Sequence, residues 1–269
     1  MYATFSYSKT MNLLSITLSL LSLLHICTAQ SADPAAYSCN PNSKTNSSNN
    51  QIKTLLDNLV SGTIQRGFIS TVQGAGGKNQ IYGLAQCRGD VSKNDCSTCI
   101  NDAAKNILKL CPGQSDARIW YDFCFLRYGR SNFFGQVDTS GFFLINVQNV
   151  TDAAIFNKKL AALMNKVGSR APKPASRGLG KGKSDVSPFD RLYGLVQCTR
   201  DLSELACAQC ASIAIGNLPI VCGDKRGCRV LYGSCYVRYE LYPFFFPLEA
   251  KESIQHHTVN YKSVLAFNP

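Results

Sequence analysis

The chain contains the same cysteine-bearing stretch twice, and this repeat constrains the fold more than any other feature. Residues 81–99 read IYGLAQCRGDVSKNDCSTC and residues 192–210 read LYGLVQCTRDLSELACAQC, so both contain the spacing C-x8-C-x2-C. The alignment continues without a gap through two further cysteines in each copy. The aligned cysteines are Cys87, Cys96, Cys99, Cys111 and Cys124 in the first copy and Cys198, Cys207, Cys210, Cys222 and Cys235 in the second. Two copies are too few for a solenoid, so the repeat predicts two small domains in tandem.

The first residues predict a secretory signal peptide. Lys9 precedes an apolar run at residues 13–26, and Ala29 suits a cleavage site, so residues 1–29 are expected to be removed. The alternative is a membrane anchor, but this run is shorter than the roughly 20 residues that span a bilayer. We expect no other stretch to cross a membrane, and the chain lacks the apolar tail of a lipid-anchor signal. The sequence therefore predicts a secreted, extracellular protein without a transmembrane anchor.

The cysteine count predicts a disulfide framework. The chain has 13 cysteines, and removal of the signal with Cys27 leaves an even number in an exported protein. Zinc is the alternative for C-x2-C, but zinc sites usually draw on a second such pair or on two histidines. The histidines beyond the signal, His256 and His257, are adjacent near the end of the chain. We therefore expect disulfides, no metal site and no cofactor.

The formal net charge of +11 is spread unevenly. Residues 166–191 are rich in Gly, Pro and Ser, and they contain Lys166, Arg170, Lys173, Arg177, Lys181 and Lys183. We interpret this segment as a solvated basic loop; the alternative is a binding strip for anionic polysaccharide, phosphate or a membrane surface. Nucleic acid is not expected as a partner of an exported chain. Residues 249–269 are expected to form a polar tail, and Asn46 and Asn149 each begin a glycosylation sequon.

Each copy is expected to begin with an amphipathic helix. Apolar residues recur with helical spacing at Ile52, Leu55, Leu56, Leu59 and Val60 in the first copy, and at Phe156, Leu160, Leu163 and Val167 in the second. Thr151 and Asp152 are candidate caps of the second of these helices. Another helix is expected to begin near each C-x2-C and to end at Pro112 or Pro219.

The remaining aligned segments predict strands. Residues 118–128 and 229–242 are rich in aromatic and β-branched side chains with partial alternation. The fold class is therefore α+β, with an antiparallel sheet and two helices in each domain. Each disulfide-closed loop adds about 2–4 kcal/mol of stability, mainly by restricting the unfolded chain.

The sixth cysteine lies at a different place in each copy. The first copy has Cys39 far upstream, whereas the second has Cys228, which aligns with Ala117. If the five shared cysteines pair alike, both odd cysteines must reach the same aligned partner, within about 6 Å between Cα atoms. Cys39 is then expected to lie near Ala117, and Asn40 near Arg118.

These features resemble the plant cysteine-rich repeat secretory proteins, whose domain is homologous to the antifungal seed protein ginkbilobin-2. The resemblance rests on C-x8-C-x2-C, YG-x2-QC, RVLYGSC and RYELYPFFFP, and it covers nearly all of the mature chain. It implies two domains, at residues 31–136 and 137–248, each a five-stranded antiparallel sheet with two helices. The disulfides that it implies are Cys39–Cys111, Cys87–Cys96, Cys99–Cys124, Cys198–Cys207, Cys210–Cys235 and Cys222–Cys228.

The resemblance also implies candidate sugar-binding residues. Ginkbilobin-2 binds mannose through an Asn, an Arg and a Glu at fixed distances from its cysteines. The first copy matches with Asn40 and Arg118 but has Gly129 in place of the Glu, and the second matches with Arg229 and Glu240 but lacks the Asn. Neither triad is complete. The alternative is structural: Arg229 and Glu240 form an ion pair, and Asn40 caps a turn.

No residues indicate catalysis, because the cysteines are expected to be paired and no serine or carboxylate cluster has the context of a catalytic motif. We therefore expect a non-enzymatic binding module of the plant apoplast with a role in defence or stress, binding a cell-wall glycan or acting as an antifungal. The alternative is a module that docks on apoplastic or receptor proteins. Domains of this family can pack as a pair, for which the aromatic residues of 236–246 would provide a buried face.

Overall fold

The computed structural model describes residues 33–43, 49–76, 80–248 and 259–266. The described residues from Pro34 onward belong to one compact unit that contains both repeats. The expected signal peptide, Asn46 and the two tail histidines lie outside the described residues.

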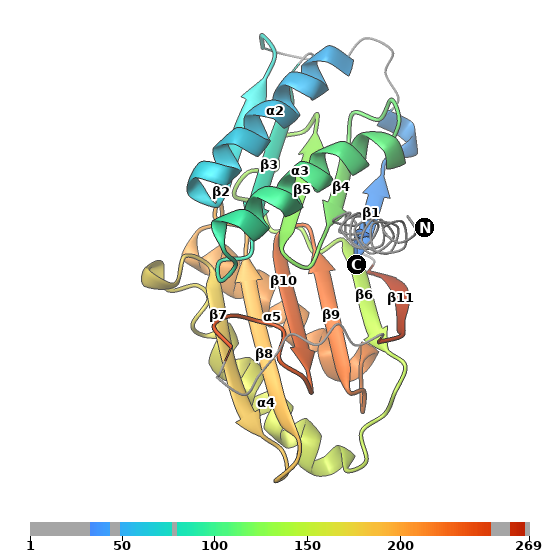
Figure 1. Cartoon of the computed structure of the whole chain (residues 1–269), viewed down its shortest axis with the longest axis vertical. Coiled ribbons are helices and arrows are strands. Elements are labelled where there is room, and N and C mark those ends of the chain that lie inside the picture. The colour runs from blue at the N-terminus through green and yellow to red at the C-terminus, as the bar shows by residue number, and fades with distance from the viewer. Residues whose placement is uncertain (1–32, 44–48, 77–79, 249–258, 267–269) are drawn as a thin grey trace, which may run out of the picture. The chain divides into compact units, whose positions relative to one another are not determined.

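The first repeat is a five-stranded antiparallel sheet with two helices on one face (Figure 1). The strand order is β1-β4-β5-β3-β2. The elements are β1 (Ala36–Cys39), α2 (Asn49–Arg66), β2 (Phe68–Gln73), β3 (Ile81–Cys87), α3 (Lys93–Leu110), β4 (Ala117–Trp120) and β5 (Cys124–Gly129), with a short 3-10 helix at Pro41–Ser43. The expected fold of this repeat is therefore confirmed.

The second repeat has the same arrangement with one additional strand. Its sheet order is β11-β6-β9-β10-β8-β7, and α4 and α5 lie behind the sheet in the view of Figure 1. The elements are β6 (Gly141–Asn146), α4 (Ala153–Gly168), β7 (Leu179–Asp185), β8 (Arg191–Cys198), α5 (Glu204–Val221), β9 (Gly227–Tyr232), β10 (Cys235–Glu240) and β11 (Tyr261–Ala266), with a 3-10 helix at Pro174–Ser176. The α+β class is confirmed, but this sheet has six strands.

The cysteine-bearing helices begin and end at aligned positions. Ser92 and Ser203 cap α3 and α5 by accepting hydrogen bonds from backbone amides in the first turn. The expected end of α5 at Pro219 is wrong, because the helix continues to Val221. There the backbone amide of Cys222 donates a hydrogen bond to the carbonyl of Leu218. The backbone amide of Cys111 donates to the carbonyl of Ile107 in the same way at the end of α3. The repeated backbone geometry, and not the proline, sets this end.

The expected basic loop at residues 166–191 is also wrong. Its first residues belong to α4, and Leu179–Asp185 form β7, which pairs along its whole length with β8. Gly180 is buried directly beneath α4, where an added Cβ would lie 2.0 Å from the carbonyl oxygen of Val167. Small residues thus serve here to let a helix approach a strand closely.

The expected polar tail contains β11. This strand pairs with β6 from Tyr261 opposite Asn146 to Ala266 opposite Gly141. It adds the sixth strand at the edge of the second sheet. Alternation is weak in this short segment, so the sequence pattern did not separate it from a coil.

The core of each repeat lies between its helices and its sheet. The expected helix faces are buried: Ile52, Leu55, Leu56 and Leu59 in α2, and Phe156, Leu160, Leu163 and Val167 in α4. Asp152 caps α4 by accepting a hydrogen bond from the amide of Ile155.

Six disulfides join the helices and strands of the two repeats. They are Cys39–Cys111, Cys87–Cys96, Cys99–Cys124, Cys198–Cys207, Cys210–Cys235 and Cys222–Cys228, the pairs that the resemblance implies. Cys39 lies directly opposite Ala117 across β1 and β4, so the position inferred from the odd cysteines is confirmed.

Within the described part of the chain, one helix, α5, is long and apolar enough for a membrane span by length and composition. Its cysteines Cys207 and Cys210 are bonded to β8 and β10, and its inner face is part of the core. In this structure α5 is therefore a helix of the folded domain.

Candidate functional site

The arginines of the expected sugar sites lie where the two repeats meet. Arg118 on β4 is directly opposite Arg127 on β5. At the aligned positions of the second repeat, Arg229 on β9 is directly opposite Arg238 on β10. Like charges opposed across a strand pair repel each other. Each arginine pair therefore needs a negative charge beside it.

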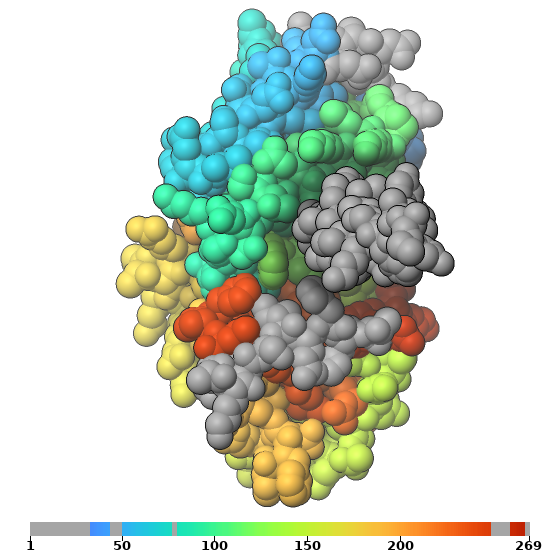
Figure 2. All heavy atoms as spheres, viewed as in Figure 1, coloured from blue at the N-terminus to red at the C-terminus, as the bar shows by residue number. Residues whose placement is uncertain are grey.

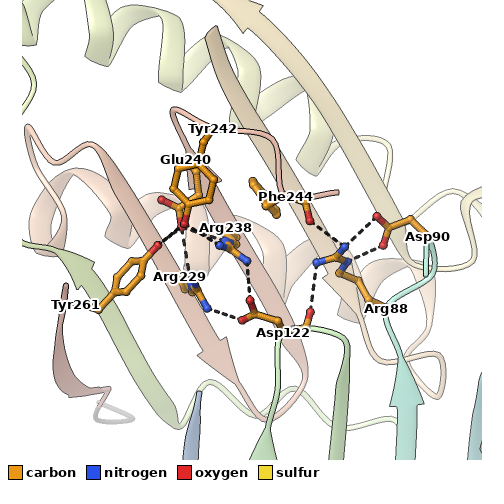
Figure 3. Close-up of polar contacts among 9 residues, drawn as sticks. All are labelled: Arg88, Asp90, Asp122, Arg229, Arg238, Glu240, Tyr242, Phe244 and Tyr261. Atoms are coloured by element: carbon orange, nitrogen blue, oxygen red, sulfur yellow. Dashed lines mark hydrogen bonds and ion pairs between the residues drawn. The ribbon is translucent and has the colours of Figure 1, made fainter. Parts of the chain in front are cut away.

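Asp122 of the first repeat supplies that charge to the second. It lies in the turn between β4 and β5 and forms an ion pair with Arg229, and its Oδ2 lies 3.4 Å from Nη1 of Arg238. Figure 3 shows the carboxylate pointing toward both guanidinium groups from across the junction. The Asp122 carbonyl also accepts a hydrogen bond from Nη1 of Arg88 at 3.2 Å.

Asp138 supplies the negative charge beside the arginine pair of the first repeat. Its Oδ2 lies 2.8 Å from Nη1 of Arg118 and 3.2 Å from Nη1 of Arg127. The second repeat holds Asp138 in place, because Ser234 in the β9–β10 turn accepts a hydrogen bond from its amide. An added Cβ at the neighbouring Gly233 would lie 2.7 Å from Oδ2 of Asp138, so the glycine leaves room for the carboxylate. The charge of each arginine pair is thus partly neutralised by an aspartate that the other repeat holds.

Glu240 is fully buried beside the second arginine pair. Its Oε1 lies 3.0 Å from Nε of Arg238 and 3.6 Å from Nε of Arg229. Tyr261 of β11 donates its hydroxyl to the same oxygen, and its ring centre lies 4.5 Å from the guanidinium carbon of Arg229 (Figure 3). Arg229 and Glu240 therefore lie close together, but they form an ion pair, and Tyr261 of strand β11 contacts both of them.

In the first repeat the two expected residues have different partners. The register of β1 and β4 places Ser38 opposite Arg118, and Arg118 contacts Asp138 and Ser140. The side-chain amide of Asn40 donates instead to Asp116 at 3.4 Å.

Two glutamines that sequence reasoning did not assign join the repeats. Gln86 accepts a hydrogen bond from the amide of Arg200 at 2.9 Å, and Gln197 accepts one from the amide of Gly89 at 2.9 Å. Gln86 also donates to the carbonyl of Cys198 at 2.9 Å. The glutamines occupy aligned positions, as do Arg200 and Gly89, so the contact has approximate two-fold symmetry. Their identity in both copies was a signal for this role, because a buried polar residue needs a partner.

An arginine and an aspartate from the first repeat fix the aromatic segment after β10. Arg88 is ion-paired with Asp90 at 2.6 Å and donates to the carbonyl of Phe244 at 3.0 Å, and the amide of Phe246 donates to Asp90 at 2.7 Å. Figure 2 shows this segment, in orange-red, against the first repeat in green. Phe244 and Phe245 are buried, as the composition of residues 236–246 predicted.

Electrostatics at the junction favour the ionised carboxylates. Burial raises the pKa of Asp122, but the charges of Arg238, Arg229 and Arg88 outweigh this effect and lower the pKa below its ordinary value. For Asp138 burial is likewise outweighed, by Arg118 and by hydrogen bonds from Ser140, so its pKa is also lowered.

Arg127 stays charged at neutral pH despite its environment. Burial and the neighbouring Arg118 lower its pKa to about 10. The ring of Phe133 lies over its guanidinium group at 3.7 Å and supports the charge from the other side.

The cavity between the repeats is small. It has a volume of about 50 Å³ and is lined by aromatic and polar residues of both repeats, including Trp120, Phe123, Gln197 and Tyr236. Small-molecule sites usually have volumes of roughly 300–1,000 Å³. This cavity has room for a water molecule or two, and a monosaccharide does not fit it.

Asn149, which begins a glycosylation sequon, is exposed, and its side-chain oxygen accepts a hydrogen bond from Nζ of Lys225 at 2.7 Å. Among the described residues, no cluster of three or more His, Cys, Asp or Glu side chains could hold a metal ion.

Comparison with known proteins identifies the family of both repeats. The model of the salt stress response/antifungal family matches residues 34–131 and 145–242. Cysteine-rich repeat secretory protein 55 from Arabidopsis thaliana is 52% identical over 236 residues, which cover 85% of this chain and 90% of the relative. An antimicrobial ginkbilobin-2-like protein from Castanea crenata is 42% identical over 237 residues, with 86% of this chain and 96% of the relative covered.

A solved structure shows the same two-repeat arrangement. The tandem DUF26 ectodomain of the cysteine-rich receptor-like protein PDLP8 from Arabidopsis thaliana matches with a TM-score of 0.68 and 28% identity, covering 77% of this chain and 97% of that one. The chain therefore belongs to the salt stress response/antifungal family and is a secreted, extracellular cysteine-rich repeat protein with two family domains in tandem.

Proposed function

We propose that this protein is a non-enzymatic binding module of the plant apoplast that recognises other proteins and does not recognise sugar through the expected residues. One observation carries the proposal: Arg118, Arg229 and Glu240 are engaged in ion pairs at the junction of the two repeats. The side chain of Glu240 has no exposed surface, and that of Arg229 is 12% exposed.

Sugar binding at Arg229 would be costly for this molecule. A hydroxyl group that replaced Asp122 would accept a hydrogen bond but would not neutralise the opposed charges of Arg229 and Arg238. Removing one partner from a buried charge cluster leaves the remaining charges uncompensated. The arginine is therefore better explained as part of the fold than as a free sugar ligand.

The relatives support an extracellular role in stress or defence. The family model is described as salt stress response/antifungal, and the relative from Castanea crenata is named as antimicrobial. A cysteine-rich receptor-like protein kinase from Arabidopsis thaliana is 36% identical over 242 residues, which span 36% of its length. Receptor ectodomains contact extracellular ligands and proteins, so this likeness favours protein recognition. The paired cysteines support a non-enzymatic role, because none offers a thiolate.

A glycan array and an affinity capture from plant wall fluid test the proposal together. We expect no specific glycan signal and saturable capture of a wall protein by the folded, secreted chain. Mannose binding that Arg118→Ala or Arg229→Ala abolishes without a loss of thermal stability would contradict the proposal and favour the carbohydrate-binding alternative.

A further inference from the structure

The outward face of α5 is uncharged and partly apolar. Leu205 and Ile220, near the two ends of the helix, are 80% and 79% exposed, and Ile213 between them is 39% exposed. After Glu204 the helix contains no charged residue. Residues at these intervals lie along one side of a helix, so they form a continuous stripe.

The aligned helix of the first repeat shows that the fold does not require this stripe. In α3 the positions aligned with Ile213, Gly216 and Ile220 are occupied by Asp102, Lys105 and Lys109. Both helices pack on their sheets in the same way and carry the same disulfides. The loss of charge on α5 is therefore a property of its surface and has no cause in the core.

Leu205, at one end of the stripe, also lines a groove between α4 and α5. The groove has a volume of about 760 Å³ and is lined by Leu205, Ser212, Ile215 and Gly216 of α5 and by Asn165 and Ser169 of α4. An added Cβ at Gly216 would meet no atom within 4 Å, so the surface is hollowed at that point. α4 and α5 lie on the side of the second sheet turned away from the viewer in Figure 1.

Helix α4 and the turn after it carry basic residues and no acidic ones. No acidic residue occurs between Asp152 and Asp185. The exposed cations of α4 and the turn after it are Lys158, Lys159, Lys166, Arg170 and Lys173. Lys173 lines the groove, and Glu204 is the acidic residue at the same end of it.

From these observations we propose that the α4–α5 groove is a docking site for an acidic amphipathic helix of a partner protein. The apolar residues of that helix would lie along the α5 stripe, and its acidic residues would face the lysines of α4. This inference rests on the proposed function and specifies its partner. Helix-in-groove recognition uses such a row of apolar anchors with charges at the rim.

Two other occupants fit the surface less well. A membrane surface favours protruding aromatic and apolar side chains, whereas this face is concave and its lining contains Ser212, Asn165 and Ser169. A second copy of the chain packed by a two-fold axis would present this same face, in which Glu204 is the acidic residue of the groove lining, so it would offer little negative charge to the lysines of α4.

A designed peptide tests the groove directly. The probe is a labelled helical peptide of about 18 residues, which spans about 27 Å and so matches α5. It carries Leu at helical intervals with Glu on the flanks, and a second peptide has Lys in place of each Glu. Binding to the full secreted chain is measured by fluorescence anisotropy. We expect the acidic peptide to bind at least about tenfold more tightly than the basic one, and less tightly at about 1 M salt, where the screening length falls to roughly 3 Å.

The variants use the first repeat as a template. Ile213→Asp/Gly216→Lys installs the residues of α3 at exposed positions, so the chain should fold, and we expect the affinity for the acidic peptide to fall at least about tenfold. Leu108→Lys, at an exposed apolar position of α3, is the matched control and should not change binding. Equal affinity for the two peptides, or equal binding by wild type and double variant, would overturn the docking site.

Further measurements separate this inference from the proposed function. Binding to vesicles of anionic lipid, or a dimer in sedimentation, that the double variant abolishes would assign the face to a membrane or to a second copy and overturn the proposal. Capture of the same wall protein by wild type and double variant would refute docking in the α4–α5 groove, but the proposal that the protein recognises other proteins would remain. Glycan binding without protein capture would refute the proposed function itself.

Discussion

Asp122 and Asp138 stabilise the paired arginines at the junction between the repeats. Asp122 contacts the arginine pair of the second repeat and Asp138 contacts that of the first, and without carboxylates the arginines of each pair would repel each other across two strands. Comparison of the two copies could predict the arginines, because they recur at aligned positions. It could not predict the aspartates, because Asp122 aligns with Gly233, and Asp138 lies between the repeats.

Replacing Asp122 with Asn should destabilise the protein. The amide keeps the shape but loses the negative charge, so Glu240 alone offsets the repulsion between the two arginines. Asp122 is 47% exposed, so solvent screens part of this effect, and we expect a loss of about 1–2 kcal/mol in the free energy of unfolding. Chemical denaturation measures it.

Asp185→Asn is the control for that measurement. Asp185 pairs with Arg191 at 2.7 Å, but both side chains are well exposed, so the change should cost less than about 0.5 kcal/mol. Equal losses in the two variants would contradict a special role of the junction.

The lowered pKa values of Asp122 and Asp138 predict a particular pH dependence. A carboxyl whose pKa is lower in the folded state contributes stability that is complete above its unfolded pKa of about 3.9 and is lost as pH falls through the folded value. The difference in melting temperature between wild type and Asp122→Asn should therefore stay constant from pH 7 to about 4 and shrink below that. A difference that disappears near pH 6 would exclude the carboxylate as its source.

Strands β7 and β11 lie where the sequence predicted a basic loop and a polar tail. β7 contains two glycines and two lysines, which lower the strand propensity of the segment. Its position is fixed by pairing with β8 and by the close approach of α4, which are long-range contacts. β11 is likewise fixed by pairing with β6. By contrast, the helices were predicted because their apolar periodicity is local.

Gly180→Ala tests the packing of β7. The new Cβ would lie 2.0 Å from the backbone oxygen of Val167, which cannot move without displacing α4. We expect a loss of about 1–3 kcal/mol in the free energy of unfolding. Gly182→Ala is the matched control, because its Cβ would meet only side-chain carbons of Val167 and Leu163 at 3.1 and 3.2 Å. A solvated loop would tolerate both changes equally.

Tyr261→Phe tests whether β11 belongs to the buried charge cluster. The hydroxyl bonds Glu240 and lies 2.8 Å from the hydroxyl of Tyr242, so its loss removes bonds from buried polar groups. We expect a decrease of about 1–2 kcal/mol in stability, measured by thermal unfolding. Tyr37→Phe, on the 45% exposed Tyr37, should change stability by less than about 0.5 kcal/mol. Similar small effects of both variants would place Tyr261 outside the cluster.

Across the whole molecule, the repeat determined most of what could be predicted. Two aligned sets of cysteines and two aligned helix patterns led to two α+β domains, and the family resemblance supplied the disulfide pairs. The aromatic residues of 236–246 indicated a buried face between the domains, but the polar contacts there could not be predicted, because Gln86, Gln197 and the aspartates acquire partners only when the chain folds. The candidate sugar residues could be picked out in the sequence, but their partners could be seen only in the structure.

Calorimetry of wild type and Arg229→Ala, each with and without mannose, tests most directly whether Arg229 serves the fold or a sugar. The structure predicts that Arg229→Ala lowers the melting temperature by about 4–8 °C, because Asp122 and Glu240 lose a partner. It also predicts that mannose does not shift the melting temperature of wild type. A sugar at ten times its Kd would add about 1.4 kcal/mol and raise the transition by about 3–6 °C. An unchanged melting temperature in Arg229→Ala, together with a mannose-induced rise in wild type that the variant lacks, would contradict the account.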